Sequence, residues 1–542
     1  MPCTCVTSCT PGATCPGIVL MLAMLLTAPQ FVSMSSGMFR SISKKSIHID
    51  ANPKQLNYGI AVSDVDGDGD FEWIVAGFSG PNLVLKWNSD TKKLENLAID
   101  DPHSKFYHLR DPQGQAIGVS ACDVDGDGRE EIYFLNTNDA FAGKSSYGDK
   151  LFKYRNGRYE DVFSDKINAD VSLNYAGRSV ACVDREGTGK YAIYVANYAR
   201  GRIGPHRLIE LDEEKSEVSK GILKLKDVAT EAGVAKLTGG RGVVVGPILS
   251  NASDVFCVNE NGGNFLYINQ GDGTFQDLAQ PVGVLDPRQH GRGLALADFN
   301  GDGKMDIVYG NWLGPHRLYI QRGEPDKPEF QDIATEEFSK PSPIRTILAA
   351  DFDNDGHLEV FFNNIVLDEE EAPNRLFRVK RKDDGSLKVS EVDIGDAREP
   401  YGYGTGGAVA DVDGDGSLEV LLSHGEDTAQ PLTLYKVRSW VDHNWIRVFP
   451  RTQHGGPARG AKVVVETSDG RRQLRVIDGG SGYLCQMEPV AHFGLRQSEV
   501  WKLEVTWPDG TRFARRVESE ENRTTVTVDY PTDGDAAQKE EL

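Results

Sequence analysis

The sequence has little of what marks several common classes of protein. It has no long run of lysine or arginine, and its net charge is −22 with a pI near 5.0. Nucleic-acid binding rewards basic patches, so a nucleic-acid partner is not expected. Stretches of helical periodicity are scarce, which disfavours a helical fold. Beyond the first thirty residues no apolar segment is long enough to span a membrane.

The one pronounced apolar run, residues 17–28, is too short for a membrane span and has the length of a signal-peptide core. Residues 1–35 are therefore predicted to be a signal peptide, although no lysine or arginine precedes the run. A membrane anchor or a wrong start codon is the alternative. The mature chain is then secreted, into the extracellular space or matrix, without a membrane span. The terminal KEEL (539–542) resembles a retrieval signal and makes the ER lumen the alternative location.

Five copies of one acidic motif dominate the rest of the chain. Each copy has carboxylate or amide oxygens at positions 1, 3 and 5, glycine at 6 and an acid at 9, and position 7 would add a backbone carbonyl. Ca²⁺ takes about 6–8 oxygen ligands, so about five structural Ca²⁺ sites are expected. The predicted ligands are Asp64, Asp66, Asp68, Asp70 and Glu72; Asp123, Asp125, Asp127, Arg129 and Glu131; Asp298, Asn300, Asp302, Lys304 and Asp306; Asp351, Asp353, Asp355, His357 and Glu359; and Asp411, Asp413, Asp415, Ser417 and Glu419.

The EF-hand begins with the same pattern, but it requires Glu at position 12 and a helix on each side. Position 12 is apolar in all five copies, as Val75, Phe134, Tyr309, Phe362 and Leu422. Short runs of β-branched and aromatic residues follow each copy, which is typical of buried strands. Each loop is therefore predicted to lead into a strand.

The motifs recur at a nearly fixed interval. The five copies start at residues 64, 123, 298, 351 and 411, and two degenerate copies fill the wide gap. One has Asp184 at position 1 and Glu186 at position 3; the other keeps only Asp254, at position 9. Seven strand-rich units predict an all-β fold, a closed seven-bladed β-propeller over residues 45–436. A β-helix is the alternative, but its calcium-binding form repeats every nine residues.

Other segments complete the predicted domain organisation. Residues 150–163, 223–235 and 264–279 are predicted to form outer hairpins of blades. Residues 437–530 are predicted to form a small β-rich domain, because 462–467 and 502–507 alternate like half-buried strands, and 531–542 is an acidic tail. The glycine-rich stretch 478–482 is either an anion cradle of backbone amides or a tight connection.

Cysteines and sequons give weaker signals. Four of the eight cysteines fall in the predicted signal peptide. Cys122 and Cys182 lie just before equivalent motifs, so an inter-blade disulfide and two isolated thiols are both open. Asn251 and Asn522 begin Asn-x-Ser/Thr sequons and are predicted glycosylation sites in a secreted chain.

The motifs together resemble known families. The tandem loops followed by strands resemble FG-GAP/VCBS repeats, as in integrin α-subunit propellers. HNWIRV (443–448), GGPARGAKVVVET (455–467), QLRVIDGGSGYLCQ (473–486), AHFGL (491–495) and LEVTWPDGT (503–511) resemble the ASPIC/UnbV domain. This order, behind a signal sequence, resembles the cartilage acidic protein family. That resemblance implies a secreted, acidic, calcium-binding glycoprotein of matrix and nervous tissue, with receptor antagonism in some members. Many relatives add an EGF-like module, whereas no cysteine follows Cys485 here, so the chain resembles the short form.

The motifs favour binding over catalysis. No HExxH occurs, and Gly143-Lys144-Ser145 lacks the earlier glycine of a P-loop, so we expect no enzyme. The leading hypothesis is an extracellular module that binds an extracellular or cell-surface protein. The alternatives are a calcium-dependent lectin, with Trp312 or Tyr401 and Tyr403 as a sugar platform, and an ER-resident factor.

Overall fold

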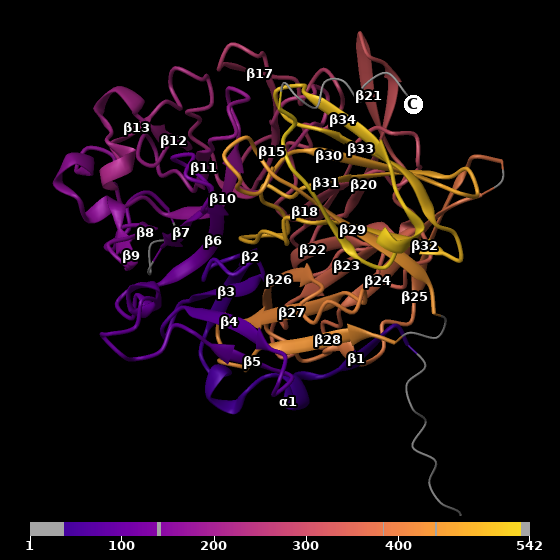
Figure 1. The fold of residues 1–542 in the computed structure, drawn as a ribbon, viewed down its shortest axis with the longest axis horizontal. Helices are drawn as coiled ribbons and strands as arrows, with labels where there is room; N and C mark the ends of the chain where they lie inside the picture. Colours follow the sequence, from indigo (N-terminus) through magenta and orange to yellow (C-terminus); the bar gives the residue numbers. More distant parts are fainter. Residues whose placement is uncertain (1–36, 138–141, 383, 439–441, 533–542) are drawn as a thin grey trace, which may run out of the picture. The chain divides into compact units, whose positions relative to one another are not determined.

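The computed structural model describes residues 37–137, 142–382, 384–438 and 442–532 (Figure 1). The predicted signal peptide and the KEEL terminus lie outside the described residues. All of these described residues belong to one compact unit. In its described part no helix has the length and apolar character needed to cross a membrane.

Seven antiparallel sheets of four strands follow one another around a ring (Figure 1). In each sheet the first strand lies innermost, and each innermost strand packs against that of the next blade. The innermost strand of the last blade packs against that of the first, which closes the ring. The predicted all-β fold and the seven-bladed propeller are therefore confirmed.

The strands of the blades have the following bounds. The first four blades are β2 (Asn57–Ser63), β3 (Glu72–Gly77), β4 (Leu83–Asn88) and β5 (Lys93–Asn96); β6 (Ala116–Cys122), β7 (Glu131–Asn136), β8 (Lys150–Arg155) and β9 (Arg158–Asp161); β10 (Gly177–Val183), β11 (Ala192–Asn197), β12 (Arg207–Leu211) and β13 (Leu225–Asp227); and β14 (Gly240–Gly246), β15 (Asp254–Asn259), β16 (Phe265–Asn269) and β17 (Phe275–Asp277). The other three are β18 (Gly291–Ala297), β19 (Asp306–Asn311), β20 (Arg317–Glu324) and β21 (Lys327–Asp332); β22 (Ile344–Ala350), β23 (Leu358–Asn364), β24 (Arg375–Arg381) and β25 (Leu387–Val392); and β26 (Gly404–Ala410), β27 (Glu419–His424) and β28 (Thr433–Val437) with β1.

The last blade takes its fourth strand from the other end of the chain. β1 (Phe39–Ser41) pairs with β28, with Phe39 opposite Val437. This strand precedes residue 45, where the sequence placed the start of the propeller. A strand of three residues is too short to show a hydrophobic periodicity. The pairing that closes the ring is therefore visible only in the folded structure.

The core of the ring lies between neighbouring blades. β6 and β7 are buried along their whole length, because both faces of their sheet contact an adjacent blade. One apolar cluster joins Ala61 and Ile74 of blade 1 to Val119 and Phe134 of blade 2. The inner strands therefore read as continuous runs of apolar and small residues rather than as an alternating pattern.

Two of the three predicted outer hairpins are present. Residues 150–163 hold β8 and β9, and residues 264–279 hold β16 and β17. The prediction for 223–235 is wrong in part, since it holds only β13. Its partner β12 ends at Leu211, and a long connection with two single-turn 3₁₀ helices separates them.

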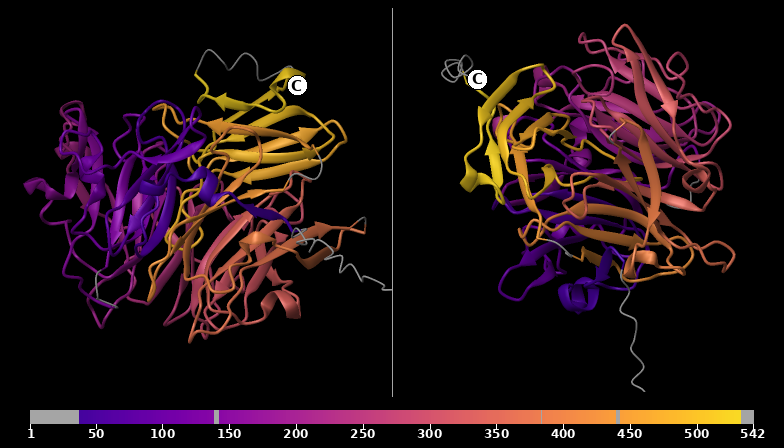
Figure 2. Two further views of the ribbon diagram at one scale, coloured as in Figure 1. Left: turned by 90° about the horizontal axis from the view of Figure 1, so that it is seen from below. Right: turned by 90° about the vertical axis from the view of Figure 1, so that its right-hand side faces the viewer.

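The C-terminal domain consists of two sheets packed face to face (Figure 2). One has the order β32 (Ala491–Arg496), β29 (Asn444–Pro450), β35 (Thr525–Val528); the other has β31 (Arg472–Val476), β30 (Lys462–Thr467), β33 (Val500–Thr506), β34 (Arg512–Arg516). Ile446 and Phe493 of the first sheet and Val463 and Leu503 of the second share one buried core. The two α-helices of the described chain, α1 (Ser43–Ser46) and α2 (Glu336–Ser339), have one turn each.

Candidate metal centres

Four of the five acidic loops gather carboxylates into a cluster. The clusters are Asp64, Asp66 and Glu72; Asp123, Asp125 and Asp127; Asp351, Asp353 and Asp355; and Asp411, Asp413 and Glu419. Within each cluster the ligand atoms lie within 4.8 Å of one another. They belong to blades 1, 2, 6 and 7, where each loop joins the innermost strand to the second strand, as predicted.

The aspartate at position 1 shapes the loop through the backbone. In the first loop Asp64 Oδ1 accepts the Gly67 N–H at 2.7 Å, and Oδ2 accepts the Gly69 N–H at 2.9 Å. Gly69 has a φ of +95°, a conformation that glycine adopts at little cost. Glycine is favoured at position 6 because the backbone has a positive φ there.

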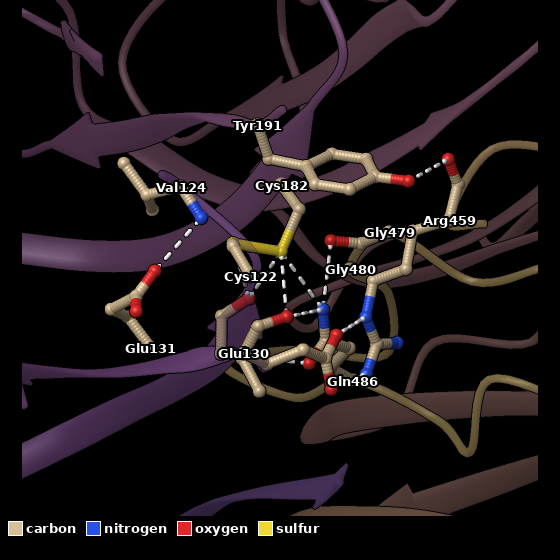
Figure 3. Close-up of a disulfide and its surroundings, with 12 residues drawn as sticks. Cys122, Val124, Glu130, Glu131, Cys182, Tyr191, Arg459, Gly479, Gly480 and Gln486 are labelled. Atoms are coloured by element: carbon tan, nitrogen blue, oxygen red, sulfur yellow. Dashed lines mark hydrogen bonds and ion pairs between the residues drawn. A yellow bond between two sulfur atoms is a disulfide. The ribbon is translucent and has the colours of Figure 1, made fainter. Parts of the chain in front are cut away.

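The two oxygens of the position-9 glutamate have different partners. Glu72 Oε2 accepts the Val65 N–H at 2.7 Å, and Glu131 Oε2 accepts the Val124 N–H at 2.9 Å (Figure 3). This bond fixes the carboxylate to its own loop, so the second oxygen faces the cluster and its basic partner. Glu359 and Glu419 do the same with the amides of Phe352 and Val412.

A basic residue of the third strand faces each cluster, and the sequence analysis missed it. Lys153 Nζ lies 2.8 Å from Asp125 Oδ2 and 2.9 Å from Glu131 Oε1. Lys86 and Lys436 take the equivalent places in blades 1 and 7, and Arg378 in blade 6. The strand register locates this basic residue, because Glu359 lies directly opposite Arg378 and Glu419 directly opposite Lys436 on the neighbouring strand.

The clusters carry more negative charge than their basic partners neutralise. Burial, and then Asp66, raises the pKa of Glu72 to about 8, although Lys86 opposes the shift. Burial, and then Asp125 and Asp127, raises the pKa of Asp123 to about 7. Four carboxylates and one ammonium leave a net charge of about −3, which one divalent cation would largely offset.

Unsatisfied oxygens show where a cation fits. The Oδ1 atoms of Asp66, Asp125 and Asp353 are buried and have no hydrogen-bond partner among the described residues. All three occupy position 3 of their loops. A buried polar oxygen without a partner is costly, and hard oxygen donors are what Ca²⁺ prefers. The residues present therefore fit a divalent cation.

The fifth loop, in blade 5, differs from these four. Asn300 Nδ2 donates to Asp302 Oδ2 at 2.9 Å, and no group of three carboxylates forms among the described residues of this loop. Position 9 is Asp306, one methylene shorter than glutamate. Its two oxygens each accept a backbone amide, of Phe299 at 2.9 Å and of Gln321 at 2.8 Å, whereas Glu72 and Glu131 accept a loop amide through Oε2.

In the two degenerate loops the remaining acids bond to the loop backbone or point outward, and they form no cluster of three among the described residues. Asp184 accepts the Thr188 and Gly189 amides, both at 2.9 Å, as a position-1 aspartate does elsewhere. Glu186 instead turns outward to Arg185 at 2.7 Å. In blade 4 Asp254 is occupied by the amides of Leu249 and Ser250, both at 2.8 Å.

The position-7 residues share one contact in all five acidic loops. The backbone N–H of each donates to the position-5 aspartate at 2.9–3.1 Å; these residues are Asp70, Arg129, Lys304, His357 and Ser417. This bond turns the peptide within the loop. The role of their carbonyls as metal ligands stays a prediction.

The C-terminal domain contacts the propeller at these loops. Asp351 Oδ2 accepts the Gly494 N–H at 3.1 Å, and Arg447 Nη1 lies 3.3 Å from Asp411 Oδ2. Arg459 of this domain is 1% exposed and forms an ion pair with Glu130 beside the second loop (Figure 3). The first carboxylate of two clusters therefore also holds the second domain.

A segment of the C-terminal domain, residues 478–488, fills the centre of the ring; we call it the plug. It forms hydrogen bonds with the innermost strand of every blade, through Ile60, Val119, Cys182, Arg241, Leu294, Thr346 and Gly407. The anion-cradle reading of 478–482 is wrong, because the Gly482 N–H donates to Leu294 O at 2.8 Å and the Ser481 N–H to Cys485 O at 3.0 Å.

A disulfide bond joins Cys122 of β6 to Cys182 of β10 beside the plug (Figure 3). The plug residue Gln486 donates to Ala121 O at 3.1 Å and to Gly479 O at 3.2 Å next to it. The bond links blade 2, which has a carboxylate cluster, to blade 3, which has none. Cys257 and Cys485 are buried free thiols.

Comparisons with known proteins agree with this architecture. The FG-GAP-like repeat model matches residues 251–309 and 298–362, and the ASPIC and UnbV model matches residues 451–534. Cartilage acidic protein 1 of Mus musculus is 58% identical over 534 residues, 96% of this chain and 82% of the mouse protein. The Homo sapiens protein is 58% identical over 534 residues, 96% of this chain and 80% of its own.

The chain belongs to the cartilage acidic protein 1 family. Neither relative is named as an enzyme. Among solved structures, the BP39L lectin from Burkholderia pseudomallei has a TM-score of 0.43 and 10% identity, over 71% of this chain and 96% of its own. At that TM-score the likeness says nothing about function.

The remaining sites predicted for this cartilage acidic protein 1 relative lie apart from the clusters. Trp312 lies under two arginines, and the Tyr401 side chain is exposed with its hydroxyl 2.8 Å from Glu371. Asn251 is exposed and accepts from Lys462 at 2.7 Å, whereas Asn522 accepts the Val500 N–H at 2.9 Å. Glycosylation at both asparagines stays a prediction.

Proposed function

We propose that this protein is a secreted, calcium-binding glycoprotein that acts as an extracellular protein-interaction module. One observation carries the proposal. The carboxylate clusters lie where the C-terminal domain contacts the propeller, as Asp351 does with Gly494 and Asp411 with Arg447. An ion in such a loop would hold its blade hairpin and would fix the aspartate that the second domain contacts.

The role of calcium in this proposal is structural. The ligands would be the acids at positions 1, 3, 5 and 9 of the four clusters, with Glu72, Glu131, Glu359 and Glu419 as the last ligand. When bound, the ion supplies positive charge to buried carboxylates that otherwise repel one another. The fifth loop is a proposed site of lower affinity, because Asn300 replaces an acid and both Asp306 oxygens already accept backbone amides.

The partner in this proposal is an extracellular or cell-surface protein, such as a matrix component or a receptor, and the protein acts by binding rather than by catalysis. Membership of the cartilage acidic protein 1 family and the buried contacts between the two domains support it. A rigid surface loses little conformational entropy on binding, which favours specific recognition.

Binding of the labelled, calcium-loaded chain to intact cells tests the proposal. We expect saturable binding that is lost after trypsin treatment of the cells and in EDTA, and that returns with Ca²⁺. Binding that survives trypsin but is abolished by glycosidases would contradict a protein partner and would favour a lectin. Binding that is insensitive to EDTA would contradict the structural role of calcium.

A further inference from the structure

Each innermost strand of the ring has a β-bulge near its start, at the end opposite to the acidic loops. The pairing register shifts there in all seven blades. A bulge re-aims side chains, and bulges are frequent next to functional sites. The first residues of the bulges, in order of blade, are Tyr58, Ile117, Arg178, Arg241, Arg292, Arg345 and Thr405.

Four consecutive blades place an arginine in this layer. Arg178 and Arg292 are 6% and 5% exposed, and the side chains of Arg241 and Arg345 are 12% and 13% exposed. They surround Tyr483 of the plug, whose hydroxyl lies 3.4 Å from Arg241 Nη1. Burial would raise the pKa of Tyr483, but the four guanidinium charges outweigh it and lower that pKa.

In the described part of the chain, two carboxylates pair with three of these arginines. Glu260 pairs with Arg241 and with Arg292, whose Nη2 lies 3.1 Å away, and Glu426 pairs with Arg345. Burial, and then Arg241, lowers the pKa of Arg292 to about 9. A guanidinium normally stays charged far above that pH, so the layer as it stands disfavours its own positive charge.

Two donors in this layer have no acceptor. Arg292 Nε and Arg345 Nε are buried and have no hydrogen-bond partner among the described residues. The Trp312 ring lies next to both groups, with centroids 5.4 Å from the Arg292 guanidinium carbon and 4.3 Å from that of Arg345. A buried N–H without an acceptor costs about 1–3 kcal/mol, more when it is charged.

We propose that this end of the ring binds an oxyanion, a carboxylate or a sulfate group, through Arg292, Arg345 and the Tyr483 hydroxyl, with Trp312 as the apolar wall. An oxyanion supplies the acceptors that both Nε atoms lack. Guanidinium groups match carboxylate and sulfate geometry because they present parallel N–H donors. Trp312, predicted from the sequence as a sugar platform, is then a wall of an anion site.

Calorimetric titration of the calcium-loaded full chain with sodium sulfate and with sodium acetate, at ionic strength held constant with chloride, tests the site. We expect one-site binding of at least one of the two anions, and the stronger one identifies the group. Arg345→Gln should weaken that binding about tenfold or more, because a charge-assisted hydrogen bond is lost. Arg158→Gln is the matched control, since Arg158 is exposed and pairs with Glu160, and it should leave binding unchanged.

Two further measurements keep the result independent of misfolding. Arg345→Lys retains the charge beside Glu426 but has no Nε donor, so it should fold and still bind more weakly. A crystal of the unaltered chain soaked in selenate should show selenium beside Arg292 and Arg345. Absence of heat with both anions, unchanged binding in both Arg345 variants, or a selenate-soaked crystal without that peak would each overturn the proposal.

Discussion

Blades 1, 2, 6 and 7 and blades 3 and 4 have the same strand order but different loops. In blade 3, Asp184 still accepts the Thr188 and Gly189 amides, as Asp64 does with its own loop. The turn therefore survives without the cluster. What blades 3 and 4 lack is the glutamate at position 9 with its basic partner, such as Glu131 with Lys153. The loop backbone and the metal site are separable properties of one repeat.

Removal of calcium should give the largest effect on this comparison. Each ion at a hundredfold excess over its Kd stabilises the fold by about 2.7 kcal/mol, so four clusters give on the order of 10 kcal/mol. EDTA should lower the melting temperature by roughly 10 °C or more, measured by calorimetry. Mg²⁺ at the same concentration should restore less, because it demands stricter octahedral geometry. An unchanged melting curve on chelation would show that all blades behave like blades 3 and 4.

Loss of the disulfide should give the next largest effect, because it attaches a blade without a cluster to one that has a cluster. Cys122 and Cys182 are 60 residues apart, and closing such a loop contributes about 4 kcal/mol in the chain-entropy account. Urea unfolding of the Cys122→Ser, Cys182→Ser double variant should show that loss. A reductant should destabilise the unaltered chain but not the double variant; equal sensitivity would refute the assignment.

A pair of substitutions compares the two kinds of loop directly. Asp125→Asn removes a fully buried carboxylate from the second cluster and should cost one ion, about 2.7 kcal/mol of calcium-dependent stability. Glu186→Gln should change stability by no more than about 0.5 kcal/mol, because that side chain is 56% exposed and its ion pair is with the neighbouring Arg185. Melting with and without Ca²⁺ measures both. Similar losses in the two variants would mean that blade 3 also binds a cation.

Replacement of the basic partner should give the smallest change in calcium-loaded protein. Lys436 Nζ lies 2.6–2.9 Å from Asp413, Asp415 and Glu419, so Lys436→Met leaves those carboxylates to repel one another when calcium is absent. We expect lower stability in EDTA, tighter calcium binding at this loop, and a net change within about 1 kcal/mol at saturating Ca²⁺. Calcium titration followed by calorimetry checks both signs. Weaker calcium binding would show that the lysine belongs to the metal site rather than opposing the ion.

The sequence predicted the repeat more fully than the contacts between repeats. The acidic loops, the strands after them and the count of blades follow from local spacing. Lys153 and Arg378 do not, because their place opposite Glu131 and Glu359 depends on hairpin register, which loops of different length conceal. Residues 478–482 were predicted to be either an anion cradle or a tight connection, because a glycine-rich stretch shows no long-range partner. Only the closed ring places residues 478–488 within hydrogen-bonding distance of seven strands.

The arginine layer was hidden for a related reason. Arg178, Arg241 and Arg292 each follow a glycine at the start of a strand, but the sequence does not show that a bulge turns each of them towards Tyr483. The shared position becomes visible only when the innermost strands are aligned by their pairing.

The pairing of β1 with β28 has a consequence for how the chain is made. Phe39 is synthesised among the first residues, yet its partner Val437 follows about four hundred residues later. Pairing over such a separation is slow, because the entropy of closing the loop is lost before the contacts form. Blades 1–6 can form in order as the chain emerges, while β1 waits for β28, and the ring closes only after translation of the last blade. A short strand ahead of the first blade thus delays completion of the propeller until its last blade has been made.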